Sequence, residues 1–227
     1  MSLITENIYK LRAEVDGINP ACEIVAATKT RSLTEIKEVA STGFISAAGE
    51  NRAQELVEKY DDGLVWDFIG RLQTNKVKYI VGKVRLIHSL DRMSLAEAIE
   101  KESVKKNVIS DVLIEINTGR EENKGGIFLE DAESFYEKLS VFPHIKVRGL
   151  MAVAEKKDGQ SLREVFDEVY KTFDRMRSED FRYLSMGMSN DYVAALESGS
   201  NMIRPGRIIF GERASYGKSE GSENNLP

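Results

Sequence analysis

A lysine at the end of an apolar run offers amine chemistry near the start of the sequence. The segment "IVAATKTR" spans residues 24–31 and places Lys29 between two threonines, just after a predicted strand. Burying an ammonium group costs hydration, so such a lysine either turns to solvent or stays partly buried for chemistry. A half-buried amine favours the neutral form, which attacks aldehydes and ketones. Taken alone, Lys29 fits both interpretations, a reactive amine and a side chain that reaches solvent.

Two segments of small residues near the other end of the sequence could hold an anion. The first, "LSMGMSND", contains Ser185 and Ser189, and the second, "RPGR", contains Gly206 and Arg207. Free backbone N–H groups and the positive end of a helix dipole bind phosphate in such turns. The alternative is a pair of tight turns with a helix cap and no ligand. A phosphate beside a reactive amine would point to a phosphorylated carbonyl compound.

Alternating apolar runs and amphipathic segments predict the scaffold that positions these residues. The pattern is that of βα units around a parallel sheet, preceded by a helix over about residues 3–16. Helix starts are indicated at Ser32 with Glu35, Asn75, Asp91, and Ser161 with Glu164. The predicted strands are Glu23–Thr28, Gly43–Ala47, Asp67–Gly70, Leu86–Ser89, Asp111–Asn117, Lys146–Met151, Tyr183–Ser185 and Asn201–Arg204, each but the last followed by a clear helical stretch.

Eight βα units in this length predict an α/β protein, a single-domain (β/α)8 TIM barrel with an N-terminal helix, over residues 1–213. In such a barrel the loops after strands 7 and 8 are the recurrent phosphate site. A doubly wound open sheet is the alternative fold. Residues 214–227 are poor in apolar side chains, and we expect a disordered tail there.

Composition excludes several classes of protein. The 227 residues are 41% hydrophobic and 30% charged, with a net charge of −5, which gives no electrostatic footprint for nucleic acid. Cys22 is the only cysteine, and His88 and His144 are far apart, so neither a disulfide framework nor a zinc motif is expected. The sequence shows no leader and no run approaching the roughly 20 apolar residues of a membrane span. We therefore expect a cytoplasmic monomer.

Seven segments in order along the chain resemble the motif series of the pyridoxal phosphate homeostasis proteins. They are "AATKT", "GENRAQE", "FIGRLQTNK", "HSLD", "GLMAV", "LSMGMSND" and "RPGRIIFG", between about Glu23 and Gly211. That family resembles the N-terminal barrel domain of alanine racemases and binds pyridoxal 5′-phosphate (PLP). The resemblance implies that PLP is the cofactor, that the barrel is of the alanine racemase N-terminal type, and that PLP-dependent apoenzymes are candidate recipients of the cofactor.

The resemblance also assigns roles to individual residues. Lys29 would hold the cofactor as an internal aldimine, with Asn51 nearby. The cofactor-binding set that it implies is Lys29, Asn51, Ser185, Met186, Ser189, Arg204, Gly206 and Arg207, with Ser185, Ser189 and the backbone of Gly206 and Arg207 on the phosphate. The sequence departs from the usual pattern at Ala48, Asp67, Pro205 and Arg207, where loop details are expected to differ.

Arg204 bears on whether the protein is an enzyme. An arginine at this place donates to the pyridine nitrogen, as the resemblance implies, and a guanidinium keeps its proton, so the ring stays a weak electron sink. The alternative for Arg204 is a surface arginine at a strand end.

An alanine-type racemase also needs a second base, a tyrosine from a separate domain of the partner subunit, for which we find no candidate. A class I aldolase would need its lysine on the sixth strand, where Lys146 stands at the wrong end. We therefore expect a PLP carrier or buffer for cellular PLP homeostasis, with a PLP-dependent amino-acid racemase as the alternative.

Overall fold

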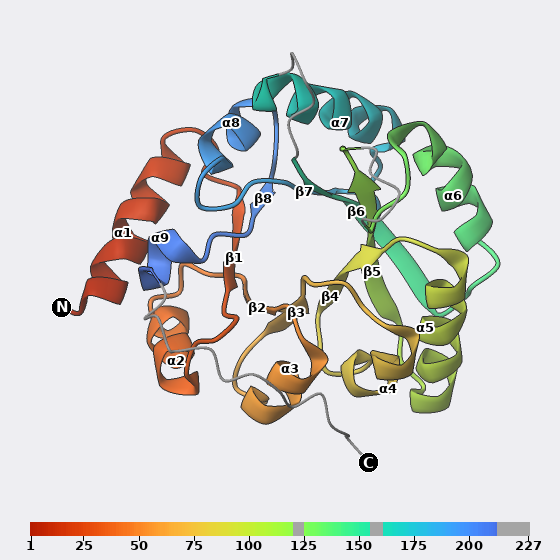
Figure 1. The fold of residues 1–227 in the computed structure, drawn as a ribbon, viewed down its shortest axis with the longest axis horizontal. Coiled ribbons are helices and arrows are strands. Elements are labelled where there is room, and N and C mark those ends of the chain that lie inside the picture. The colour runs from red at the N-terminus through yellow and green to blue at the C-terminus, as the bar shows by residue number, and fades with distance from the viewer. Residues whose placement is uncertain (120–124, 155–160, 213–227) are drawn as a thin grey trace.

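Eight parallel strands form a closed barrel in the order β1 to β8 (Figure 1). The computed structural model describes residues 1–119, 125–154 and 161–212. Closure through the pairing of β1 with β8 confirms the predicted barrel and rules out the open sheet. The tail predicted at 214–227 lies outside the described residues. The strands are β1 Glu23–Ala27, β2 Ala47–Glu50, β3 Trp66–Phe68, β4 Leu86–Leu90, β5 Ser110–Asn117, β6 Ile145–Val153, β7 Tyr183–Ser185 and β8 Met202–Ile203.

Helices form a ring outside the barrel (Figure 1). The capping boxes at Ser32 with Glu35 and at Ser161 with Glu164 are both present, as predicted. Asn75 instead lies inside a 3-10 turn, and Arg92 rather than Asp91 precedes the next helix, without a side-chain cap. The helices are α1 Leu3–Asp16, α2 Leu33–Ser41, α3 Ala53–Lys59, η1 Thr74–Lys76, α4 Val77–Ile80, α5 Met93–Lys106, η2 Leu129–Asp131, α6 Ala132–Leu139, α7 Leu162–Met176, α8 Tyr192–Glu197 and α9 Arg207–Phe210.

The second strand lies later in the chain than predicted. Gly43 has φ +72° and begins a connection, and Phe44 and Ile45 pack against the cluster formed by α1, β1 and α9 instead of joining the sheet. Small residues, "AAGE", form β2 because the space is narrow: a Cβ on Gly49 would lie 2.9 Å from Val25 Cγ1. The apolar residues of this segment therefore predicted the strand too early in the chain.

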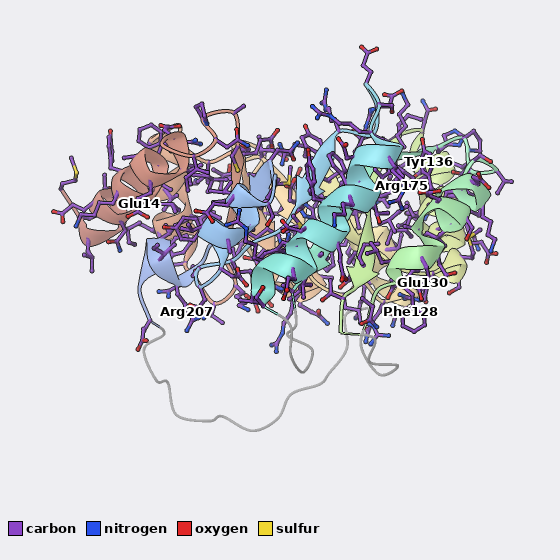
Figure 2. The ribbon with its side chains drawn as sticks, turned by 90° about the horizontal axis from the view of Figure 1, so that it is seen from above. Glu14, Phe128, Glu130, Tyr136, Arg175 and Arg207 are labelled. Atoms are coloured by element: carbon purple, nitrogen blue, oxygen red, sulfur yellow. The ribbon has the colours of Figure 1, made fainter. Side chains whose placement is uncertain are left out.

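The N-terminal helix covers the seam where the barrel closes. Helix α1 packs against α9 and α2, and Asn7 Nδ2 donates to the carbonyl of Ile209 at 3.1 Å. Figure 2 shows Arg207 and Phe128 along one edge of the molecule, the edge where the strands end and the βα loops begin. Among the described residues no helix has the length and apolarity to cross a membrane.

Candidate functional site

Lys29 lies in the turn that follows β1. Thr28 is fully buried, whereas Lys29 is exposed, and Thr30 adopts φ +65°, which few non-glycine residues do. Of the two interpretations, the structure therefore agrees with the one in which the side chain of Lys29 reaches solvent. Within the described part of the chain the amine forms no hydrogen bond or ion pair. No contact among the described residues holds this amine, and its reaction with a cofactor stays a prediction.

The backbone on both sides of Lys29 is clamped by the segment "GENRAQE" and the end of α3. Glu55 Oε2 accepts from the Thr30 N–H at 2.9 Å. Lys59 Nζ donates to the Thr28 carbonyl at 3.2 Å, to Glu50 Oε1 at 2.9 Å and to Glu55 Oε2 at 3.1 Å. The Thr28 hydroxyl also donates to Glu50 Oε1 at 2.7 Å. The turn is held in place while its lysine side chain remains unattached.

Burial sets the charge state of this clamp. Burial raises the pKa of Glu50, and the hydrogen bonds from Thr28 and Lys59 offset only part of that rise. Burial also acts to raise the pKa of Glu55, but the Thr30 N–H and Lys59 outweigh it and lower that pKa. Lys59 therefore compensates a carboxylate that water cannot reach.

Asn51 follows β2 at the mouth of the barrel. Its Oδ1 is buried and has no hydrogen-bond partner among the residues that the structure describes, as is rare for a side-chain acceptor. Gly70 permits this position, because a Cβ there would lie 2.1 Å from the Asn51 carbonyl oxygen. An unpartnered acceptor at the place predicted for a cofactor fits a ligand that brings a donor or an ordered water.

The loops after β7 and β8 meet beside the end of β1. Ser189 Oγ accepts from the N–H groups of Gly206 at 3.1 Å and Ile208 at 3.3 Å. The Ala27 N–H donates to the carbonyl of Pro205 at 2.8 Å, and a Cβ on Gly206 would lie 3.1 Å from the Ala27 carbonyl oxygen. The structure therefore brings the predicted phosphate loops next to the strand that precedes Lys29.

Two other predicted residues differ in what they offer a ligand. Met186 is fully buried and its side chain belongs to the main core, so only its backbone could serve the site. Arg207 is exposed on the face that carries the βα loops (Figure 2), and its Nη2 donates to Asn190 Oδ1 at 2.8 Å. A guanidinium so placed can be recruited to a phosphate.

Arg204 and Ser185 lie together inside the barrel. Arg204 is 4% exposed, which rules out the surface arginine. Its Nη1 donates to the Ser185 carbonyl at 2.7 Å and to Ser185 Oγ at 2.5 Å, and its Nη2 donates to the Ala152 carbonyl at 2.9 Å. Burial lowers the pKa of Arg204 to about 10, so it stays protonated at neutral pH. The Ser185 hydroxyl faces Arg204, and its contact with phosphate stays a prediction.

Glu115 is a residue of the barrel mouth that we did not single out from the sequence. Burial raises the pKa of Glu115 to about 7, and the nearby carboxylate of Asp91 adds to the rise. Its Oε2 is buried and has no hydrogen-bond partner within the described ranges. A glutamate within the apolar segment "DVLIEIN" was the available signal, because charged residues rarely occupy a buried strand unless they are paired.

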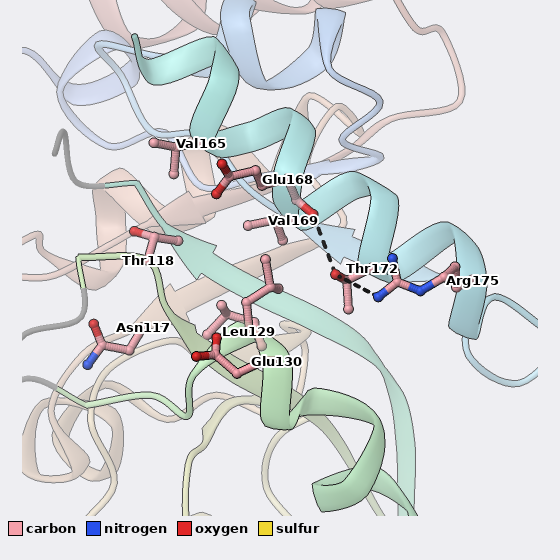
Figure 3. A pocket seen from close by; sticks show the side chains of 10 residues that line it. Asn117, Thr118, Leu129, Glu130, Val165, Glu168, Val169, Thr172 and Arg175 are labelled. Carbon is pink, nitrogen blue, oxygen red and sulfur yellow. Dashed lines mark hydrogen bonds between the residues drawn. The ribbon is translucent and has the colours of Figure 1, made fainter. Parts of the chain in front are cut away.

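A cavity of about 230 Å³ lies outside the barrel, between the end of β5, η2 and α7 (Figure 3). Val165, Val169 and Leu129 form its apolar part, and Arg175 Nη2 donates to Thr172 Oγ1 at 3.3 Å at one end. None of the residues predicted to bind the cofactor lines this cavity. The candidate site is therefore formed by the loops at the barrel mouth.

Comparison with known proteins shows the family of the chain. Residues 1–214 match the family described as "Alanine racemase, N-terminal domain". The pyridoxal phosphate homeostasis protein of Aquifex aeolicus is 40% identical over 221 residues, covering 94% of this chain and 96% of that protein.

Solved structures share the same fold. PipY of Synechococcus elongatus, solved with PLP bound, has a TM-score of 0.78 at 26% identity, covering 92% of this chain and all of that one. Alanine racemase of Clostridium difficile has a TM-score of 0.73 at 16% identity, covering 93% of this chain but 56% of the racemase, and shows the fold alone. On the match to the family and the relative at 40% identity, the chain belongs to the alanine racemase N-terminal domain family, among the pyridoxal phosphate homeostasis proteins.

Proposed function

We propose that this protein binds PLP at the mouth of the barrel through Lys29 and takes part in the homeostasis of this reactive aldehyde. The observation that carries the proposal is the convergence of the loops that hold Lys29, Ser189 and Gly206, with the Ala27 N–H bonded to the loop after β8 at 2.8 Å. The relatives named for PLP homeostasis and the PLP-bound PipY structure support the same ligand.

The residues present fit PLP. Lys29 offers an unattached amine to the aldehyde carbon, and Asn51 offers a buried acceptor without a partner. We place the phosphate beside Ser189 and Gly206, with Arg207 in the same loop; Gly206 packs so closely on β1 that a Cβ there would lie 3.1 Å from the Ala27 carbonyl oxygen. PLP supplies an aldehyde that reacts reversibly with amines.

Arg204 favours a carrier over an enzyme. We assign it to the pyridine nitrogen, where its charged guanidinium donates a hydrogen bond and keeps its proton. The ring then withdraws electrons weakly, which disfavours chemistry at an amino-acid α-carbon. Lys146, the lysine an aldolase would use, is exposed at the start of β6, the opposite end of the barrel from the βα loops. We accordingly propose little or no turnover, with release of PLP to apoenzymes, by a cytoplasmic monomer.

Borohydride reduction after incubation with PLP tests the attachment. Peptide mass mapping should find the pyridoxyl group on Lys29, and the Lys29→Ala variant should lose it. Lys10→Ala, which changes an exposed lysine on α1, is the matched control and should be labelled like the unaltered protein. A label on Lys59 or Lys76 in place of Lys29 would overturn the assignment.

Deuterium exchange tests the carrier against the racemase. We expect slow or undetectable exchange at the α-carbon of L-alanine when the PLP-loaded protein is incubated in deuterated water. Exchange or racemisation at about 1–1,000 per second, the usual range for enzymes, would favour the racemase. Transfer of PLP to an apoenzyme faster than free dissociation would be needed to support direct delivery.

A further inference from the structure

A row of buried polar side chains continues from Arg204 across the interior of the barrel. Ser185 Oγ lies 3.3 Å from His88 Nδ1, and His88 Nε2 lies 3.2 Å from Asp67 Oδ2. All three side chains are at most 1% exposed, and they come from β7, β4 and β3. The proposed function gives Asp67 and His88 no role.

Asp67 is fixed as a carboxylate at the far end of this row. Arg85 Nε donates to Asp67 Oδ1 at 3.0 Å and Arg85 Nη2 donates to Oδ2 at 2.7 Å, while Arg85 Nη1 also donates to Glu23 Oε2 at 2.6 Å. Burial acts to raise the pKa of Asp67, but hydrogen bonds from His88 and Arg85 outweigh it and lower that pKa. An ionised carboxylate can only accept hydrogen bonds.

This carboxylate determines which nitrogen of His88 carries the proton. Burial lowers the pKa of His88, so the ring is neutral and has one N–H. That proton belongs on Nε2, which faces Asp67, and leaves Nδ1 as a bare acceptor. The hydroxyl of Ser185 then donates to Nδ1 and presents its lone pairs to Arg204.

Among the acceptors of Arg204 in the described part of the chain, only the Ser185 hydroxyl can also act as a donor. The other two are the carbonyls of Ser185 and Ala152, which can only accept. With a proton on His88 Nδ1, the hydroxyl would have no acceptor in the row for its own proton, and its rotation, which sets where its lone pairs face Arg204, would no longer be fixed by His88. The direction of the hydrogen bonds along the row therefore affects how Arg204 is oriented.

We infer that Asp67 and His88 are positioning residues of the cofactor site: they hold the Ser185 hydroxyl as an acceptor and so orient Arg204 toward the pyridine nitrogen of PLP. The inference rests on the proposed function. It assigns the Ser185 hydroxyl to the ring end of the cofactor, whereas the sequence predicted it at the phosphate.

Nitrogen-15 NMR of the protein without PLP tests the row on its own. The protein has two histidines, and a His144→Gln variant leaves His88 as the only imidazole. At neutral pH we expect the proton on Nε2 and a bare Nδ1. A proton on Nδ1, or a doubly protonated ring, would overturn the inference whether or not PLP binds.

A double-mutant cycle tests the effect on the cofactor. His88→Phe keeps the ring but removes both contacts, and Ser185→Ala removes the hydroxyl but keeps the carbonyl. Each should weaken PLP binding about tenfold, the worth of one hydrogen bond to a charged group. Because His88 acts through that hydroxyl, the double variant should bind no more weakly than the weaker-binding single variant.

The positioning role would be overturned if the losses of PLP affinity in the two single variants multiplied in the double variant, or if the single variants bound PLP like the unaltered protein. The matched control is His144→Phe, which changes a half-buried histidine that contacts Glu100 and lies outside the row. If His88→Phe does not fold, Ser185→Ala and the NMR measurement still decide. Failure of the unaltered protein to bind PLP would instead refute the proposed function, leaving the NMR result to judge the row.

Discussion

Replacing Lys59 by methionine tests the clamp around the Lys29 turn. The side chain of Lys59 is 15% exposed and that of Glu50 is fully buried, so the change removes the cation from a carboxylate that water cannot reach. Breaking a buried pair in this way costs about 3–5 kcal/mol when the remaining charge stays ionised. Thr28 still donates to Glu50 Oε1, so we expect the low end, about 3 kcal/mol at pH 8.

The loss of unfolding free energy in Lys59→Met should become smaller as the pH falls, because Glu50 can take up a proton. The pKa of Glu50 in the folded protein is already raised above its value in the unfolded chain. The free energy of unfolding therefore falls as the pH rises from the unfolded-state pKa to the folded-state pKa. Lys59 lowers the folded-state pKa of Glu50, so Lys59→Met should raise that pKa further above the unfolded-state value. A larger fraction of the variant's carboxyl is therefore neutral at pH 5 than at pH 8, and the loss should be smaller at pH 5.

Urea unfolding at pH 5 and pH 8, followed by the fluorescence of Trp66, measures both values. Trp66 is the only tryptophan and is buried in β3, so its emission reports on the barrel itself. Lys101→Met is the matched control, because Lys101 is exposed on α5, and it should change stability by less than about 0.5 kcal/mol. A loss that is equal at the two pH values, or no larger than that of the control, would refute the reasoning.

Two further predictions concern the mouth of the barrel. Gly70→Ala places a Cβ 2.1 Å from the Asn51 carbonyl, so the backbone must move; we expect a loss of about 3 kcal/mol or more in unfolding free energy, and unchanged stability in urea would contradict the close approach. Ser189→Ala removes the hydroxyl that lies between the two phosphate loops, so PLP affinity should fall about tenfold while that of unphosphorylated pyridoxal changes little. Titration calorimetry with both ligands decides, and equal losses would show that Ser189 does not bind the phosphate.

Local sequence signals predicted what depends on local physics. Capping boxes at Ser32 and Ser161 were recognisable because the serine and its glutamate stand three residues apart and satisfy each other's backbone. Apolar runs predicted the strands whose side chains pack against large neighbours. They placed β2 wrongly, because the narrow space beside that strand selects small residues such as Gly49. The spacing of apolar residues in the sequence does not show how much space a strand will have beside its neighbours in the barrel.

Contacts between distant segments decided the features that the sequence did not predict. The exposure of Lys29 follows from the way Lys59 and Glu55 hold its turn. The orientation of the Ser185 hydroxyl depends on His88, 97 residues away in the chain, and no spacing rule connects the two. The family resemblance indicated which residues share the site, whereas only the assembled barrel shows which atoms they present to one another.

The pairing of β1 with β8 determines when the site can exist during synthesis of the chain. Lys29 leaves the ribosome early, whereas Ser189, Arg204 and Gly206 come from its last βα units. At about 5–20 residues per second, the roughly 180 residues that separate Lys29 from Gly206 take about 10–35 s to add. Throughout that interval Lys29 is present without the loops expected to hold a phosphate. A nascent chain can therefore meet PLP only as it meets any exposed amine, and selective capture must wait until the last strand joins the first.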